Sequence, residues 1–133
     1  MGTRSNIGIL NEDGTFEVIY CHWDGYVAHN GKILLESYTK VSKIRKLISL
    51  GDISILAHNI GKKTDFDNRD GNQVIAYGRD RGEENVEALI YPNLDEYFEY
   101  VDDAIEYVYV FDVKAKKWMY TADDRPELSE LII

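Results

Sequence analysis

The sequence predicts an α+β fold: a single domain over residues 1–133, with a mainly antiparallel sheet of about five strands and three or four helices packed mostly on one face. Three observations lead to this prediction. The length of 133 residues fits one domain with a modest core. The strand-like segments follow one another in hairpins, which favours antiparallel pairing over a βαβ arrangement. The stretches between them carry apolar residues at helical spacing.

The first two strands are predicted to form a hairpin. Ile7 and Ile9 alternate with small or polar residues, and residues 11–15 (NEDGT) supply a turn in which Gly14 is free to adopt positive φ. Residues 15–23 (TFEVIYCHW) are rich in β-branched and aromatic residues. Because both faces of this second strand are partly apolar, we expect it to be central in the sheet. One face carries Phe16, Val18, Tyr20 and His22, and the other carries Ile19, Cys21 and Trp23.

Helical segments are predicted after the hairpin. Asn30 is a candidate N-cap for residues 31–38, and Ser42 is one for residues 43–50, which Gly51 would end. In the same way, we expect Asp52 to cap a short helical piece over residues 53–59. Residues 61–72 are polar and turn-rich and predict a loop, and residues 73–79 predict a third strand.

The C-terminal part continues with a helix and two strands. Asn93 and Glu96 have the spacing of a capping box, so a helix is predicted to begin there. Residues 105–111 alternate as a strand, and residues 118–120 form the last clear strand after a turn. The tail over residues 126–133 is expected to be a short helix or an edge strand.

Negative charge is concentrated in one segment. The net charge is −9, and the residues from Glu83 to Asp112 include ten acids and no Lys or Arg. Elsewhere, 14 acids (24 − 10) stand against 15 bases. Such a chain repels nucleic acid and anionic membranes and suits basic partners, although a solvated face kept for solubility has the same composition.

The acidic segment is the first candidate binding site. Six of the ten tyrosines lie between Tyr91 and Tyr120, and tyrosines interleaved with acids are typical of protein-binding surfaces. Acids recurring every three or four residues would form a line along one side of the predicted helix. The candidate partner-binding residues are Asp95, Glu96, Glu99, Asp102, Asp103 and Glu106.

The stretch YCHWDGY at residues 20–26 gathers side chains that can bind a metal. Zinc accepts thiolate, imidazole and carboxylate ligands, so Cys21, His22, Asp24 and His29 are candidate ligands. Neighbours on a strand point to opposite faces, so Cys21 and His22 would share a metal only at a bulge, and they would not form a nucleophilic pair. The structural interpretation is that the stretch closes one end of the sheet. No cofactor is required by the sequence.

A second candidate site has two arginines after the third strand. Two arginine forks beside glycines, in GRDRGEE at residues 78–84, suit a phosphate or carboxylate. The alternative is an internal clamp in which Arg79 or Arg81 holds Asp24 or Asp80. The candidate ligand-binding residues for a nucleotide-like molecule are Arg4, Trp23, Tyr26, Arg79 and Arg81.

Other features bear on the compartment. No apolar run reaches the roughly 18 residues that span a bilayer. The first ten residues lack the apolar core of a signal peptide. Cys21 is the one cysteine, so no intrachain disulfide forms. These features predict a cytoplasmic protein without a membrane partner.

Five motifs together resemble a family of small phage and prophage proteins. They are the opening TRSxIxI, then IYCHWDGY, GKxLLExY, LGDxS and YGRDRGE, and the resemblance covers most of the first 85 residues. The part from Glu87 onward matches only as an acidic, tyrosine-rich end. Members of this family mostly lack an assigned activity. The resemblance implies an origin in a mobile element, and small acidic phage proteins of this size include anti-CRISPR proteins, some of which bind Cas9.

These observations lead to one expected function and two alternatives. We expect a non-enzymatic, phage-encoded anti-defence protein in the cytoplasm of the infected or lysogenic host. It would inhibit a nucleic-acid-binding effector, a Cas9-type nuclease above all, without binding nucleic acid itself. The first alternative is a sponge for a nucleotide-like defence signal. The second is a small enzyme that uses His22 and Asp24 as acid–base residues.

Overall fold

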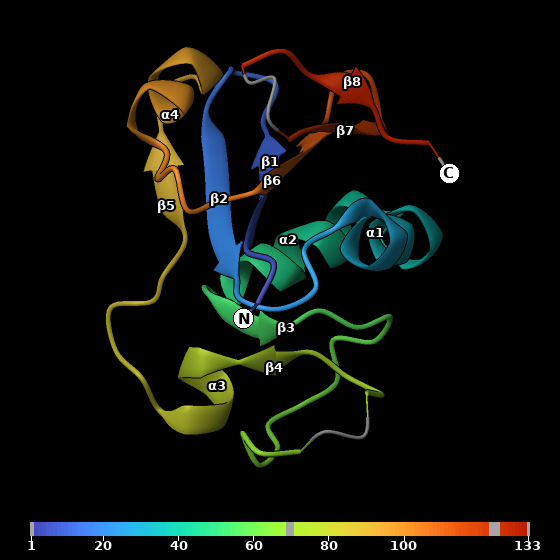
Figure 1. Ribbon diagram of the computed structural model, residues 1–133, viewed down its shortest axis with the longest axis vertical. Helices are drawn as coiled ribbons and strands as arrows, with labels where there is room; N and C mark the ends of the chain where they lie inside the picture. Colours follow the sequence, from blue (N-terminus) through green and yellow to red (C-terminus); the bar gives the residue numbers. More distant parts are fainter. Residues whose placement is uncertain (1, 69–70, 123–125, 133) are drawn as a thin grey trace.

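The computed structural model describes residues 2–68, 71–122 and 126–132 (Figure 1). The predicted loop at residues 61–72 and the predicted tail at residues 126–133 are thus described in part, since residues 69–70 and 133 lie outside these ranges. Eight strands of the described chain form one sheet: β1 (Ser5–Leu10), β2 (Phe16–Cys21), β3 (Ile53–Ile55), β4 (Ile75–Ala76), β5 (Leu89–Tyr91), β6 (Tyr107–Asp112), β7 (Lys117–Thr121) and β8 (Ser129–Glu130).

The sheet is mixed but mostly antiparallel. Its order is β4-β3-β2-β1-β6-β7-β8, and β5 pairs with β2 outside this path. The β1–β6 and β2–β3 pairs are parallel, and the other five pairs are antiparallel. The α+β class is confirmed, whereas the expected number of about five strands is too low. Strands β3, β5 and β8 have two or three residues each, too few for a periodic pattern to identify them.

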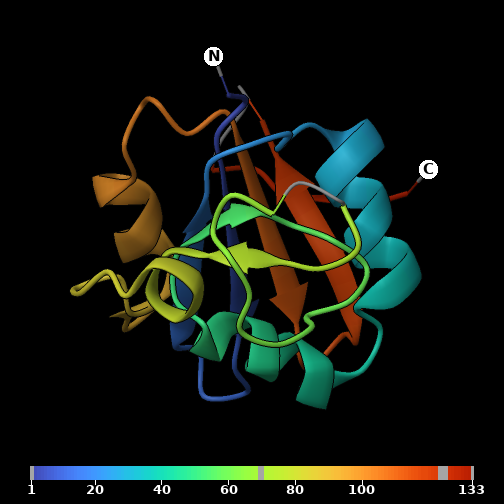
Figure 2. The same ribbon diagram turned by 90° about the horizontal axis from the view of Figure 1, so that it is seen from below.

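The central hairpin is as predicted. Strands β1 and β2 pair antiparallel around a turn in which Gly14 has φ +92°. β2 is a central strand, and its two faces belong to two separate cores. Ile19 and Cys21 pack under the helices α1 (Lys32–Ser37) and α2 (Val41–Ser49), and Phe16 and Val18 pack under α4 (Leu94–Tyr100). Helices therefore cover both faces, with α1 and α2 on one and α4 on the other, where most of the helices were expected on one face (Figures 1 and 2).

Two predicted N-caps have other roles. The helical region begins with a π-helical turn, η1 (Val27–Gly31), so Asn30 lies within it and is fully buried. Its side-chain amide donates to Ser5 Oγ (3.3 Å) and Cys21 Sγ (3.4 Å). Helix α2 begins at Val41, one residue before Ser42. The predicted end of α2 is confirmed, since Gly51 follows it with φ +76°.

The segment after Gly51 is a strand, not the predicted helix. Residues 53–55 form β3, and the Asp52 carboxylate accepts a hydrogen bond from Tyr20 N (2.9 Å). That amide lies where the edge of β2 passes from its partner β5 to its partner β3. Asp52 thus satisfies a backbone donor that neither strand reaches.

The predicted strand at residues 73–79 is short, because the chain leaves the sheet after Ala76. β4 has two residues, and helix α3 (Tyr77–Arg81) follows at once. The predicted N-cap of α4 is confirmed: the Asn93 side chain accepts a hydrogen bond from Glu96 N (2.8 Å), which is one of the two hydrogen bonds of a capping box. The tail contains the edge strand β8, one of the two predicted alternatives.

Candidate functional site

A groove of about 380 Å³ lies between β2, β5, α4 and the segment after α4. We call it the tyrosine groove. Four tyrosines line it together with one arginine and one acid, and these residues come from distant parts of the sequence. They are Arg4, Tyr20, Tyr91, Tyr97, Tyr100 and Asp102. The volume is within the range of small-ligand and side-chain sites.

The floor of the groove is buried and its rim is exposed. Tyr97 is 1% exposed, and its hydroxyl accepts a hydrogen bond from Asn6 Nδ2 (2.8 Å). The rings of Phe16 and Tyr91 meet the Tyr97 ring edge-on, with centroids 4.8 and 5.3 Å away. Tyr100 is 66% exposed at the rim. The groove therefore offers an incoming group a well-packed aromatic floor and an exposed tyrosine at its rim.

Arg4 enters the groove from the start of the chain. Its backbone is fixed, because its N–H donates to Glu106 Oε2 (3.2 Å) and its C=O accepts from Glu106 N (2.9 Å). Its exposed guanidinium makes no hydrogen bond or ion pair with any residue that the structure describes. An unpaired arginine at a groove is available to a ligand.

Tyr20 and His22 extend the same face of β2. The Tyr20 hydroxyl lies 2.6 Å from His22 Nδ1. Burial lowers the pKa of His22, and the positive charge of Arg4 lowers it further, so the imidazole is neutral at pH 7. Burial raises the pKa of Tyr20, an effect that Arg4 opposes. At neutral pH, Arg4 is thus the charged group of this trio.

The predicted line of acids is broken after α4. The helix ends at Tyr100 because Val101 is extended (ψ 136°), so Asp102, Asp103 and Glu106 do not continue the row of Asp95 and Glu99. Asp102 and Asp103 lie in a turn instead, in which the Asp102 carboxylate accepts from Ala104 N (2.8 Å), and Glu106 follows this turn beside Arg4. Glu96 is half-buried, and the other five acids are exposed.

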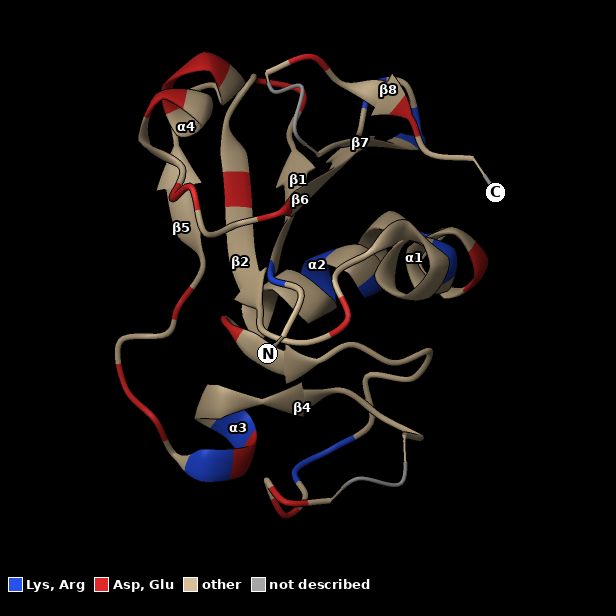
Figure 3. Ribbon diagram, viewed as in Figure 1, with Lys and Arg blue, Asp and Glu red and all other residues tan. Residues whose placement is uncertain are grey.

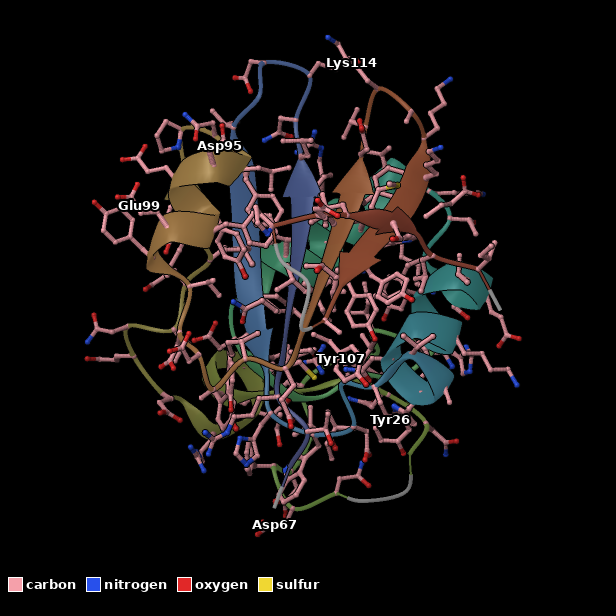
Figure 4. The ribbon with its side chains drawn as sticks, turned by 45° about the horizontal axis from the view of Figure 1, so that its top comes forward. Tyr26, Asp67, Asp95, Glu99, Tyr107 and Lys114 are labelled. Carbon is pink, nitrogen blue, oxygen red and sulfur yellow. The ribbon has the colours of Figure 1, made fainter. Side chains whose placement is uncertain are left out.

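Five of these acids still form an exposed, negatively charged region, which we call the acidic surface. The acidic surface consists of the exposed acids of α4 and of the segment after it: Asp95, Glu99, Asp102, Asp103 and Glu106. None of them forms an ion pair with a Lys or Arg of the described chain. Asp95 and Glu99 extend from α4 toward solvent, and no basic ribbon lies beside α4, whereas Arg4 lies next to Glu106 at the other end of this surface (Figures 3 and 4). This surface borders the tyrosine groove, so uncompensated charge and aromatic rings are available to one partner.

The two arginines of GRDRGEE act within the protein. Arg79 Nε donates to the buried Asp80 carboxylate (3.0 Å), and its other nitrogens donate to Ile60 O (3.0 Å) and Val74 O (2.6 Å). Arg81 stacks on the rings of Phe66 and Tyr77. The predicted internal clamp is confirmed for Asp80. Neither arginine, nor Trp23 or Tyr26, lines the tyrosine groove, so Arg4 is the member of the predicted ligand set that lies in this groove.

YCHWDGY closes one end of the sheet. Gly25 N donates to Thr3 O (2.8 Å), and a Cβ on Gly25 would lie 2.7 Å from that oxygen. Gly25 O accepts the buried Tyr109 hydroxyl (2.6 Å). Asp24 turns the chain with φ 56° and makes no ion pair with Arg79 or Arg81, which corrects the expectation that an arginine would hold it.

The candidate metal ligands point in different directions. The Cys21 thiol is buried on the α1 side, where burial raises its pKa to about 11, and His22 faces the other side beside Tyr20. His29 Nδ1 is 2.9 Å from Asn30 Oδ1. Among the residues described, no three His, Cys, Asp or Glu side chains converge as a metal site. His22 Nδ1 is engaged by Tyr20, and no hydrogen bond joins His22 to Asp24 in the described chain, so a role for these two residues in acid–base catalysis stays a prediction. Zinc binding stays a prediction.

One serine–histidine contact was not anticipated. Ser37 Oγ is 2.5 Å from His58 Nδ1, and Glu36 Oε1 is 4.0 Å from His58 Nε2. The His58 and Glu36 side chains are both 52% exposed. A nucleophilic triad needs a base that is held firmly by its third member, and a 4.0 Å contact in solvent does not provide this.

Sequence reasoning found Arg4 and Asp102 but assigned them to different sites. It missed Tyr20, Tyr91, Tyr97 and Tyr100 as one group, although the excess of tyrosine is a signal for such a surface. No helix in the described ranges has both the length and the apolar character needed to cross a membrane. Comparison of the chain with protein-family models, curated proteins and solved structures finds no match, so a function has to be argued from the site itself.

Proposed function

We propose that this protein binds and inhibits a basic, nucleic-acid-binding protein, and that it acts by binding without catalysis. The observation that carries the proposal is the acidic surface without basic partners beside the tyrosine groove. A Cas9-type nuclease is the first partner to test, because the motifs resemble phage proteins and such nucleases hold nucleic acid in positively charged channels. The proposed setting is the cytoplasm of an infected or lysogenic bacterial host.

Charge and aromatic surface would contribute differently to binding. The acids would meet Lys and Arg of the partner's channel, which speeds encounter and weakens as salt is added. The tyrosines would supply contact area at low entropic cost, and Tyr100 and Leu89 are exposed at the rim for this role. With a net charge of −9, the protein would occupy the channel in place of the nucleic acid.

The test is a charge reversal with a matched control. The test variant carries Lys in place of Asp95, Glu99 and Asp102. The control variant carries Lys in place of three exposed acids outside this surface, Glu36, Asp67 and Glu127, so the net charge changes equally in both. Inhibition of DNA cleavage and the association rate with a Cas9-type nuclease are measured at two salt concentrations. We expect the first variant to lose inhibition and the control to retain it. Equal inhibition by both variants would show that the acidic surface is only a solvated face.

A second candidate function is supported by Arg4. An unpaired guanidinium beside four tyrosines suits a planar ligand with an anionic group, such as a nucleotide-like signal. A stabilising ligand raises the melting temperature, so a panel of nucleotides would identify it. The shift should disappear in Arg4→Gln and persist in Arg81→Gln, because Arg81 does not line the groove. The absence of any shift across the panel would remove this candidate.

A further inference from the structure

Strand β5 is an open edge of the sheet. It pairs with β2 on one side, and no other strand of the described chain pairs with it (Figure 1). Leu89 and Ile90 are 60% and 67% exposed, unlike the apolar residues of the neighbouring strands. Exposed apolar edge strands are uncommon in monomers because they invite pairing with another chain.

The ladder shows which backbone groups of β5 are open. The N–H groups of Tyr20 and His22 point away from β1, toward Asp52 Oδ1 and Ile53 O. Because the direction repeats every two residues, Phe16 and Val18 also point this way, toward their partners Tyr91 and Leu89. Ile90 lies between these partners, so its N–H and C=O point outward from the sheet.

The side chains of an added strand would have a groove on each face. Leu89 and Tyr91 line the tyrosine groove. On the other face, a groove of about 320 Å³ is lined by Ile90 with Ile9, Ile48, Glu87 and the Glu17–Arg45 ion pair. Strand addition gains affinity from main-chain hydrogen bonds and specificity from alternate side chains in such pockets.

The charge around β5 indicates what kind of strand fits. Glu84 and Glu87 precede the strand, and Asp95 and Glu99 follow it. No Lys or Arg occurs between Arg81 and Lys114. In space, Arg4 lines the tyrosine groove and Arg45 lines the other groove, where it pairs with Glu17 (3.6 Å), so the acids around β5 outnumber two arginines. We propose that the β5 edge binds an extended segment of the partner protein in which apolar and basic residues alternate, added as a further strand beyond Ile90. This inference rests on the proposed function, because both require a basic partner.

The probe is a ten-residue peptide of alternating valine and lysine with blocked ends. Hydrogen exchange of the Ile90 amide is measured by NMR with and without the peptide. A peptide paired with the edge should slow this exchange about 100-fold at a concentration 100 times its Kd, by mass action. The same peptide N-methylated at every residue keeps its charge, but it donates no hydrogen bond to Ile90 O and its N-methyl groups prevent close approach to the edge, so it should give no protection.

Two substitutions separate backbone from side-chain contributions. Ile90→Pro removes an outward N–H that is not used within the sheet, and proline is tolerated at such edge positions. Ile90→Thr removes the apolar side chain but keeps the N–H and the β-propensity. We expect Ile90→Pro to weaken peptide binding at least tenfold and Ile90→Thr to weaken it less. If circular dichroism shows that Ile90→Pro does not fold, strand addition is judged from hydrogen exchange of the Ile90 amide in the unmodified protein.

The outcomes distinguish this inference from the proposed function. Protection of Ile90 by the plain peptide alone supports strand addition. Binding that shifts the Asp95 and Glu99 amides while Ile90 exchanges freely would overturn strand addition and leave the charge-based function standing. A peptide that does not bind at low salt would also overturn strand addition. The proposed function would then be tested separately, by the nuclease assay of the charge-reversal variant.

Discussion

Changing Asp80 to asparagine should destabilise the protein strongly. The Asp80 side chain is fully buried, and its carboxylate accepts from Thr64 N (2.9 Å), Ala76 N (2.7 Å) and two nitrogens of Arg79 (3.0 and 3.1 Å). An amide has one oxygen, so its NH2 group would face a donor where the second oxygen now accepts. Removing one charge also leaves Arg79 without its counter-ion.

The expected loss is about 3–5 kcal/mol, the usual cost of removing one partner of a buried ion pair. A domain of this size has about 5–15 kcal/mol of unfolding free energy in total. The melting temperature should fall by about 10–20 °C. Urea unfolding, followed by tryptophan fluorescence and circular dichroism, would measure the difference. Asp67→Asn is the control, because Asp67 is exposed and should change the free energy by less than about 0.5 kcal/mol.

The effect should depend on pH in a defined direction. Burial alone would raise the pKa of Asp80, but the hydrogen bonds from Arg79, Ala76 and Thr64 outweigh it and lower the pKa below its usual value of 3.8. The contribution of Asp80 is therefore complete above that value and is lost as the pH falls through the lowered pKa. The gap between wild type and variant should be constant at neutral pH and shrink in acid. A variant as stable as wild type at pH 7 would refute the clamp.

Three further outcomes are expected. Gly25→Ala should cost about 1–3 kcal/mol by overpacking, since its Cβ would lie 2.7 Å from Thr3 O; an unchanged melting temperature would show that the sheet end is loose. The Cys21 thiol, with a pKa of about 11, should resist maleimide in the folded protein at pH 7 and react in urea, and fast native labelling would contradict its burial. The pKa of His22, measured by NMR titration, should lie below 6.5. Because the unfolded chain then binds the imidazole proton more readily than the folded protein, the free energy of unfolding should fall as the pH drops through the lowered pKa. A titration midpoint of His22 above 6.5 would count against its burial beside Arg4.

The sequence by itself determined the features that depend on neighbouring residues. The alternation in TFEVIYCHW predicted which side chains of β2 face each core, because strand side chains alternate whatever they pack against. Asn93 was recognised as the N-cap of α4 because its hydrogen bond with Glu96 N joins residues three apart. The composition likewise indicated which segment carries the acidic surface and three of the four groove tyrosines, though not how they are arranged.

Tertiary structure alone decided the features that depend on distant residues. Asn30 and Asp52 resemble helix caps, yet Asn30 bonds Ser5 and Cys21, and Asp52 bonds Tyr20, 32 positions away. A polar side chain satisfies whichever donor or acceptor the fold buries beside it, and a local pattern does not reveal that partner. In the same way, β5 is a strand because β2 offers it an edge, and the tyrosine groove exists because that pairing brings Tyr91 beside Tyr20 and Arg4.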